Sequence, residues 1–141
     1  MKNLIVLSLL LFIPAGLFAE DIIIGMSAVF TGPSESLGIE LYRGSMAYLE
    51  HINRGGGVHG RKVMLKAYDD GYNPAKTVEL IRQLVEQDKV LCTFNTLGTP
   101  TNTAIHKYMN SKKVPMLFVA TGASKWGKPK EFPWTMGFQP D

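Results

Sequence analysis

The chain alternates short apolar runs with longer segments of helical spacing. Residues 21–29, DIIIGMSAV, are apolar at consecutive positions. This pattern suits a strand that is buried on both faces of a parallel sheet. A helical stripe follows and stops at NRGGG, and its apolar positions are Leu37, Leu41, Tyr48, Leu49 and Ile52. The opening of the domain is therefore predicted to be a strand and then a helix.

The next pair of elements repeats this order. Residues 62–70, KVMLKAYDD, alternate apolar and polar side chains, which predicts a second strand nearer an edge of the sheet. Asn73 is a good N-cap, and Pro74 suits the first position of a helix. The stripe of that helix consists of Val78, Ile81, Leu84 and Val85.

The remaining chain continues the alternation. We expect a third strand at 89–94, a polar loop at 95–102, and a helix marked by Ala104, Ile105, Tyr108 and Met109. A fourth strand at 114–120, a loop at 121–133 and a short fifth strand at 134–139 complete the pattern. Repeated strand–helix–strand units with right-handed crossovers predict an α/β fold with a doubly wound parallel sheet.

Ligands of such sheets bind at the carboxyl ends of the strands. The loops that leave strands are SAVFTGPSESLG, DDGYNP, FNTLGTPTN and VATGASKWG. The loop NRGGGVHGRK leaves a helix, so it is predicted at the opposite edge. Its Gly55, Gly57 and Gly60 match a G-x-G-x-x-G pattern. A dinucleotide fingerprint must follow a strand and open a helix, so these glycines are interpreted as a helix stop.

Other candidate chemistry is sparse. Asp69 and Asp70 end a strand, where paired carboxylates can hold Mg²⁺ or accept a phosphoryl group, but a structural role in the turn is favoured. The three histidines show no metal-ligand spacing, and no serine lies in a G-x-S-x-G motif. We therefore expect no enzyme activity, no metal and no cofactor.

The N-terminus has the pattern of a secretory signal. A short basic head precedes the apolar segment 4–17, and a small-residue region ends at Ala19, which is the predicted cleavage site. The apolar segment is too short to span a membrane. The only cysteine, Cys92, lies in an apolar run far from this site, so no lipid anchor is expected. We predict a signal peptide at 1–19, a domain at 20–141 and a periplasmic product that is not embedded in a membrane.

Charge adds little to this picture. The formal net charge is +3 over 141 residues, and the basic side chains are scattered along the chain. A nucleic-acid partner is therefore not expected.

Two strand-exit loops combine hydroxyl groups with glycines. The first contains Thr96, Leu97, Gly98 and Thr99, and the second contains Thr121, Gly122, Ala123 and Ser124. Hydroxyl groups and accessible backbone N–H groups suit a small carboxylate that is bound without chemistry. Capping of the following helices explains the same residues equally well, so local chemistry leaves both interpretations open.

Longer stretches resemble a known family. IIIGMSAVFTGPSESLG, GSMAYLEHINRGGGVHGRKVMLKAYDDGYNP and NTLGTPTNTAIHKYMNSKKVPMLFVATGASKW are similar to segments of periplasmic binding proteins for leucine, isoleucine and valine. These proteins serve ABC transporters for branched-chain amino acids. The resemblance covers residues 21–141 and implies a Rossmann-like first lobe of a two-lobe binding protein.

The resemblance also implies a site and partners. Ligand contacts are expected from residues 96–99 and 121–124, and Leu37 and Trp126 are candidate cleft walls. The partners are a small amino acid, carboxylate or amide and an ABC-transporter permease. Leu37 stands where some members have a tyrosine, and Tyr72 lies near an expected cysteine of a disulfide found in some members.

Members of the family are more than twice as long, so the second lobe is expected to be absent from this chain. A natural short product, a frameshifted gene and a partial read all remain open. Residues 20–141 alone are expected to bind amino acids very weakly or not at all, because half of the cleft is missing. The alternatives are a ligand-sensing receptor module of the same fold and, less favoured, a receiver-like or nucleotide-using α/β enzyme.

Overall fold

The computed structural model describes residues 20–140, which form a five-stranded sheet with helices on both faces. The strands are β1 (Ile22–Ala28), β2 (Val63–Asp69), β3 (Thr93–Phe94), β4 (Met116–Val119) and β5 (Thr135–Gly137). The helices are α1 (Glu35–Arg54), α2 (Pro74–Arg82) and α3 (Thr99–Lys112), with a π-helical turn η1 (Gln83–Gln87) and a 3₁₀ turn η2 (Ser124–Gly127). The predicted signal peptide lies outside the described residues.

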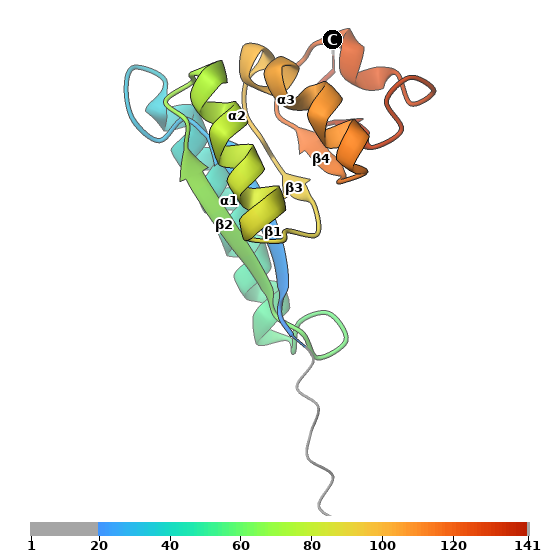
Figure 1. Ribbon diagram of the computed structural model, residues 1–141. Helices are drawn as coiled ribbons and strands as arrows, with labels where there is room; N and C mark the ends of the chain where they lie inside the picture. The colour runs from blue at the N-terminus through green and yellow to red at the C-terminus, as the bar shows by residue number, and fades with distance from the viewer. Residues whose placement is uncertain (1–19, 141) are drawn as a thin grey trace, which may run out of the picture.

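All pairings in the sheet are parallel, and the strand order is β2-β1-β3-β4-β5. The helix α1 covers one face, and α2 and α3 cover the other (Figure 1). The predicted doubly wound fold is therefore confirmed. The edge position of β2 also agrees with its alternating pattern.

The buried core lies between the sheet and the helices α2 and α3. Ile81 and Leu84 from the α2 side pack with Ile105 and Met109 of α3 and with Met116 of β4. These side chains are at most 1% exposed. Burial on this scale contributes about 1.5–3 kcal/mol for each large aliphatic side chain.

The start of α2 and the end of α1 follow their sequence signals. The Asn73 side chain accepts hydrogen bonds from the N–H groups of Ala75 and Lys76, and Pro74 is the first helical residue. At the end of α1, the N–H of Gly57 donates to the carbonyl of Ile52, and the N–H of Gly56 donates to that of Asn53. This is the Schellman arrangement, with Gly56 at a φ of +100°. The glycine-rich loop thus closes a helix, and Figure 1 places it at the far edge from the strand-exit loops.

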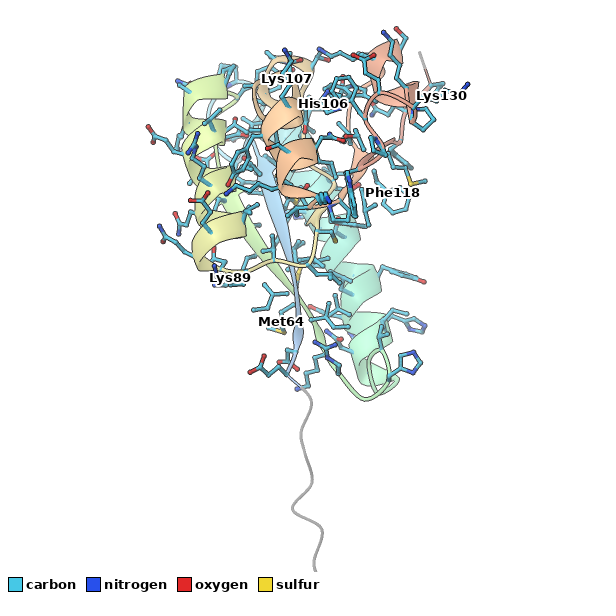
Figure 2. The ribbon with its side chains drawn as sticks, turned by 45° about the vertical axis from the view of Figure 1, so that its right-hand side comes forward. Met64, Lys89, His106, Lys107, Phe118 and Lys130 are labelled. Carbon is cyan, nitrogen blue, oxygen red and sulfur yellow. The ribbon has the colours of Figure 1, made fainter. Side chains whose placement is uncertain are left out.

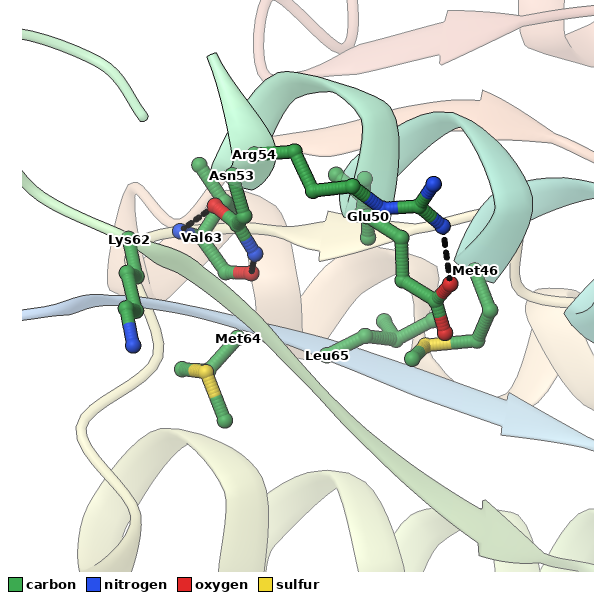
Figure 3. A pocket seen from close by; sticks show the side chains of 9 residues that line it. Met46, Glu50, Asn53, Arg54, Lys62, Val63, Met64 and Leu65 are labelled. Carbon is green, nitrogen blue, oxygen red and sulfur yellow. Dashed lines mark hydrogen bonds and ion pairs between the residues drawn. The ribbon is translucent and has the colours of Figure 1, made fainter. Parts of the chain in front are cut away.

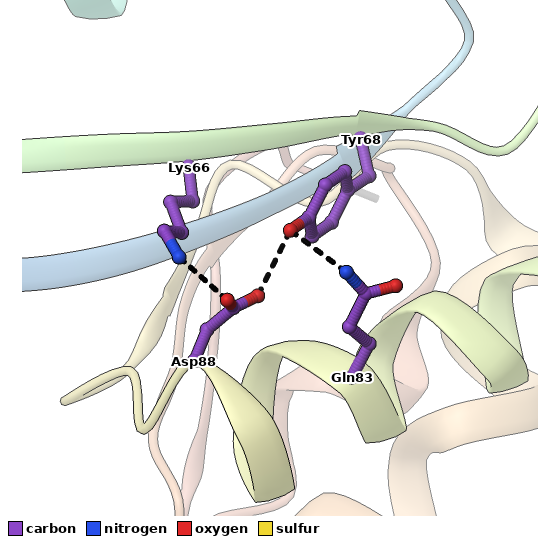
Figure 4. A network of polar contacts seen from close by, with 4 residues as sticks. All are labelled: Lys66, Tyr68, Gln83 and Asp88. Carbon is purple, nitrogen blue, oxygen red and sulfur yellow. Dashed lines mark hydrogen bonds and ion pairs between the residues drawn. The ribbon is translucent and has the colours of Figure 1, made fainter.

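The turn η1 extends α2 and carries a polar network below β2 (Figure 4). Asp88 accepts hydrogen bonds from the Lys66 ammonium at 2.5 Å and from the Tyr68 hydroxyl at 3.0 Å. The amide of Gln83 donates to the same Tyr68 hydroxyl at 3.0 Å. This network fastens the edge strand to the helical layer.

The expected boundaries differ from the structure most in the second half of the chain, where the strands expected at 114–120 and 134–139 shorten to β4 and β5. The third strand contains only two residues, Thr93 and Phe94; both pair with β4, and only Thr93 also pairs with β1, opposite Gly25. The loop expected at 95–102 is shorter, since α3 already begins at Thr99. The loop expected at 121–133 contains the turn η2.

The helix α1 packs less tightly than the other two. Only Gly38 and Ser45 of its residues are buried. A groove of about 450 Å³ runs between α1 and β2, with Met46, Met64 and Leu65 on its walls (Figure 3). The groove also contacts Asn53 and Lys62, so it reaches the edge of the sheet opposite the strand-exit loops.

Candidate functional site

The candidate site lies where β1 and β3 end side by side. The connection from β1 to β2 runs over one face of the sheet through α1, and the connection from β2 to β3 runs over the other through α2 (Figure 1). The chain therefore reverses its winding between β1 and β3. In open α/β sheets this switch point is where ligands bind.

The loop after β3 is held from inside by Asn102. The Thr96 hydroxyl donates to Asn102 Oδ1 at 2.6 Å, and Asn102 Nδ2 donates to the carbonyls of Thr96 and Gly98. Thr96 and Asn102 are at most 2% exposed. The predicted ligand contact from the Thr96 hydroxyl is therefore replaced by a structural one. Thr96 shapes the loop, and Asn102, which the sequence suggested only as a polar loop residue, locks it.

The backbone of this loop joins both neighbouring strands. The N–H of Leu97 donates to the carbonyl of Ser27 at the end of β1, and the N–H of Gly98 donates to that of Ala120 after β4. Gly98 is the N-cap of α3, with φ +100° and ψ 143°. Such a conformation is close to one that only glycine adopts readily. The N–H and carbonyl groups of Leu97 and Gly98 are therefore engaged within the protein. The N–H groups without a helical acceptor lie in the first turn of α3, at the positive end of its dipole, although Pro100 contributes none there.

The two predicted loops meet through their threonines. The Thr99 and Thr121 hydroxyls are hydrogen-bonded to each other, although the residues belong to the exits of different strands. Thr99 is half-buried and Thr121 is 8% exposed. The structure therefore brings a pair of hydroxyl groups to the first turn of α3, as the sequence predicted for two loops at one edge of a sheet.

The second loop continues with small side chains. Gly122 is exposed, and a Cβ there would lie 2.6 Å from the Pro140 carbonyl oxygen. Ala123 is half-buried, and its carbonyl accepts the N–H of Trp126 at 3.1 Å. Ser124 is exposed at the start of η2. Residues 121–124 therefore lie together beside Thr99, with Gly122 closely approached by the end of the described chain.

Trp126 corrects one expectation. Its side chain is 4% exposed and packs in the core cluster, with its ring 5.0 Å from the His106 ring and edge-on to it. It is therefore a core residue and does not form a cleft wall. His106, which Figure 2 labels on α3, also stacks on Phe132 and pairs with the Thr135 hydroxyl at 3.0 Å. Burial, helped by the charge of Lys125, lowers the pKa of His106.

Leu37 is the other residue expected to form a cleft wall, and its side chain is exposed. It lies in the first turn of α1, directly after the loop that leaves β1, and it is 60% exposed. An aliphatic side chain in that place is free to cover the apolar part of a ligand.

The aspartate pair has the structural role that the sequence favoured. Asp70 is fully buried and accepts hydrogen bonds from the Ser27 and Thr77 hydroxyls and from the N–H of Tyr72. Asp69 accepts the N–H groups of Phe30 and Gly71 and the Thr31 hydroxyl. Although its burial acts in the opposite direction, these hydrogen bonds lower the pKa of Asp69. Both carboxylates are thus engaged in joining the exits of β1 and β2.

Sequence reasoning missed Tyr72 as a neighbour of the site. Its ring leans against Gly98, and a Cβ at residue 98 would lie 2.7 Å from Tyr72 Cε2. The signal available in the sequence was its place in a strand-exit loop. The contact itself joins loops that are distant in the chain, and no local pattern reports it.

Two other kinds of site are absent from residues 20–140. No group of three or more His, Cys, Asp or Glu side chains in this part of the chain is arranged to hold a metal ion. Among the helices that the structure describes, none has the length and apolarity needed to cross a membrane.

Comparison with known proteins gives consistent matches. The model of the periplasmic binding protein family matches residues 21–141. An amino acid binding protein of Pseudomonas aeruginosa is 37% identical over 71 residues, which is 50% of this chain and 19% of that protein. A Leu/Ile/Val-binding protein homolog of Brucella melitensis is 40% identical over 65 residues, 46% of this chain and 18% of that protein.

A solved structure agrees with these matches. The crystal structure of a possible leucine/isoleucine/valine-binding protein from Rhodopirellula baltica superposes with a TM-score of 0.77 at 28% identity. The superposition covers 84% of this chain and 32% of that one. The matched regions are therefore about a fifth of the curated relatives and about a third of the solved chain. The chain belongs to the periplasmic binding protein family.

Proposed function

We propose that residues 20–141 form the first lobe of an extracytoplasmic solute-binding protein. This protein captures an amino acid or a similar small carboxylate and delivers it to the permease of an ABC transporter. Residues 1–19 act as its signal peptide, and the periplasm is its compartment. The observation that carries the proposal is the pair of hydroxyl groups, Thr99 and Thr121, at the first turn of α3.

The chemistry of this edge suits a carboxylate. Its oxygens accept hydrogen bonds, and the two threonine hydroxyls can turn from each other to donate to them. The N–H groups in the first turn of α3 and the exposed backbone at Gly122 add further donors. A carboxylate at a helix N-terminus gains about 0.3–1 kcal/mol from the dipole alone.

The relatives support the choice of ligand. Proteins named for binding amino acids, and specifically leucine, isoleucine and valine, match this chain. Exposed Leu37 beside the β1 exit provides apolar surface for a ligand body. In the proposed mechanism no bond is made or broken. A second lobe would close over the ligand and exclude water, so this lobe alone has a dissociation constant weaker than about 1 mM.

The test is a titration of the ¹⁵N-labelled processed chain, residues 20–141, with leucine followed by NMR. Leucinol, which lacks the carboxylate, is the matched control ligand. We expect leucine, but not leucinol, to move the amide signals of Thr99, Thr121 and Gly122. Signal shifts confined to amides in other parts of the sheet would contradict the proposal. So would the absence of any signal shift with leucine near its solubility limit.

A variant pair identifies the groups. Thr121→Val keeps the shape of the side chain and removes one hydroxyl, and we expect it to weaken leucine binding about threefold to tenfold. Thr103→Val removes an exposed hydroxyl that bonds only within α3 and to Lys125, so its binding should equal that of the parent chain. Equal losses in both variants would argue against a direct role for Thr121.

A further inference from the structure

The loop that leaves β2 turns toward the candidate site and carries Tyr72. The N–H of Tyr72 donates to Asp70 Oδ1 at 2.8 Å, and Asp70 is itself held by hydroxyls from β1 and α2. Tyr72 has a φ of +61°, so the chain turns sharply there. The backbone at this position is therefore tied to the buried centre of the sheet.

The ring of Tyr72 reaches across β1 to the exit of β3. Its Cε2 and Cζ atoms lie where a side chain at residue 98 would be, 2.7 Å and 3.0 Å from the Cβ position. The hydroxyl end of the ring therefore covers Gly98, the residue directly before Thr99. Since β1 separates β2 from β3 in the sheet, this contact bridges the switch point.

The ring is also available to a ligand. Tyr72 is 40% exposed although Gly98 beneath it is buried. Among residues 20–140, no hydrogen bond engages its hydroxyl group, in contrast to Tyr68 and Tyr108, whose hydroxyls bond to Asp88 and Glu86. Tyr72 thus offers an aromatic surface and a hydroxyl donor beside Gly98, the residue that directly precedes Thr99 of the threonine pair.

We propose that Tyr72 is a specificity-determining residue that forms one wall of the carboxylate site. This inference rests on the proposed function, because it takes the Thr99–Thr121 pair as the anchor for the carboxylate. The ring then contacts the body of the ligand and favours small carboxylates with a flat apolar or aromatic body. Acetate, which has almost no body, is held by the anchor and does not benefit from the ring.

The geometry explains why a glycine faces this wall. Any side chain at residue 98 would occupy the space that the Tyr72 ring fills. The pair therefore keeps the ring beside the first turn of α3, where a carboxylate would be anchored. An aromatic contact of this kind stabilises a complex beyond the area that it buries.

The experiment compares benzoate with acetate as probes of the ¹⁵N-labelled processed chain. In the parent chain, both probes should move the signals of Thr99 and Thr121. Tyr72→Ala should weaken benzoate binding about twofold to tenfold and leave acetate binding unchanged. Tyr72→Phe, which keeps the ring, should retain most of the benzoate affinity. Tyr48→Ala on α1, where the side chain is 65% exposed, is the control and should bind both probes normally.

The outcomes separate the two proposals. If neither probe binds the parent chain, the proposed function and the inference built on it both fail. If both probes bind and Tyr72→Ala changes neither, the wall is refuted and the carboxylate site stands. If Tyr72→Ala weakens acetate and benzoate equally, Tyr72 has only a structural role, which also refutes the wall. Tyr72→Phe retains the ring and its packing on Gly98, so a loss of benzoate affinity in this variant equal to that of Tyr72→Ala would also refute the wall.

Discussion

Substitution of Gly98 tests whether the edge of the sheet is built as described. Gly98 combines a φ of +100° with two close neighbours, the Tyr72 ring and Thr101 Oγ1. Alanine at this position meets backbone strain of about 1–3 kcal/mol, because the conformation is almost restricted to glycine. Its Cβ would lie 2.7 Å from the ring and 2.8 Å from the hydroxyl. Such overpacking costs a further ~1–3 kcal/mol.

Gly56→Ala provides a matched control. Gly56 also has a φ of +100°, but no atom lies within 4 Å of a Cβ at that position. We expect Gly98→Ala to lower the free energy of unfolding by about 2–6 kcal/mol and Gly56→Ala by about 1–3 kcal/mol. The difference between the variants is the contribution of the close contacts.

The assay is urea unfolding followed by circular dichroism, with midpoints compared at equal slopes. Tyr72→Ala in the Gly98→Ala background should recover part of the lost stability, because it removes one of the two neighbours. The reasoning is refuted if Gly98→Ala destabilises the chain no more than Gly56→Ala does. It is also refuted if removal of the Tyr72 ring recovers nothing.

Two other predictions concern the residues that support the site. Asn102→Ala removes the amide that donates to the carbonyls of Thr96 and Gly98. The free energy of unfolding should therefore fall by about 2–4 kcal/mol in the same urea assay. Asn102→Asp, which keeps the shape and loses the donor, should be destabilised as well, and normal stability in both would contradict this role. Because the pKa of His106 is lowered by its burial, its neutral form is favoured in the folded chain, and stability should fall as the pH drops below about 6.5. His106→Gln should reduce that fall, whereas an unchanged pH profile in this variant would show that other groups cause it.

Much of the fold could be predicted because its signals are local. Consecutive apolar residues at 21–29 and the cap at Asn73 and Pro74 depend on neighbouring positions, and β1 and α2 appear where these signals predict them. The glycine-rich turn was also assigned to the end of a helix by its order in the chain. Cys92 in the apolar run at 89–94 is buried, but apolar character does not determine how many residues of a strand pair, and only two of this run do.

The site could be predicted only in part, because it depends on contacts between distant segments. The topology rule brought residues 96–99 and 121–124 to one edge, and the structure joins them through Thr99 and Thr121. The rule does not report the direction of a side chain. Trp126 therefore turned out to be a core residue, and Tyr72 was missed although it lies in an exit loop.

The central claim is that a small carboxylate binds at the first turn of α3, where the exit of β3, which lies beside that of β1, meets the exit of β4. A crystal structure of residues 20–141 grown with a high concentration of leucine tests this claim most directly. We predict that the leucine carboxylate lies within hydrogen-bond distance of the Thr99 and Thr121 hydroxyls, at the first turn of α3. Leucine bound instead in the groove between α1 and β2, beside Met46 and Leu65, would contradict the account.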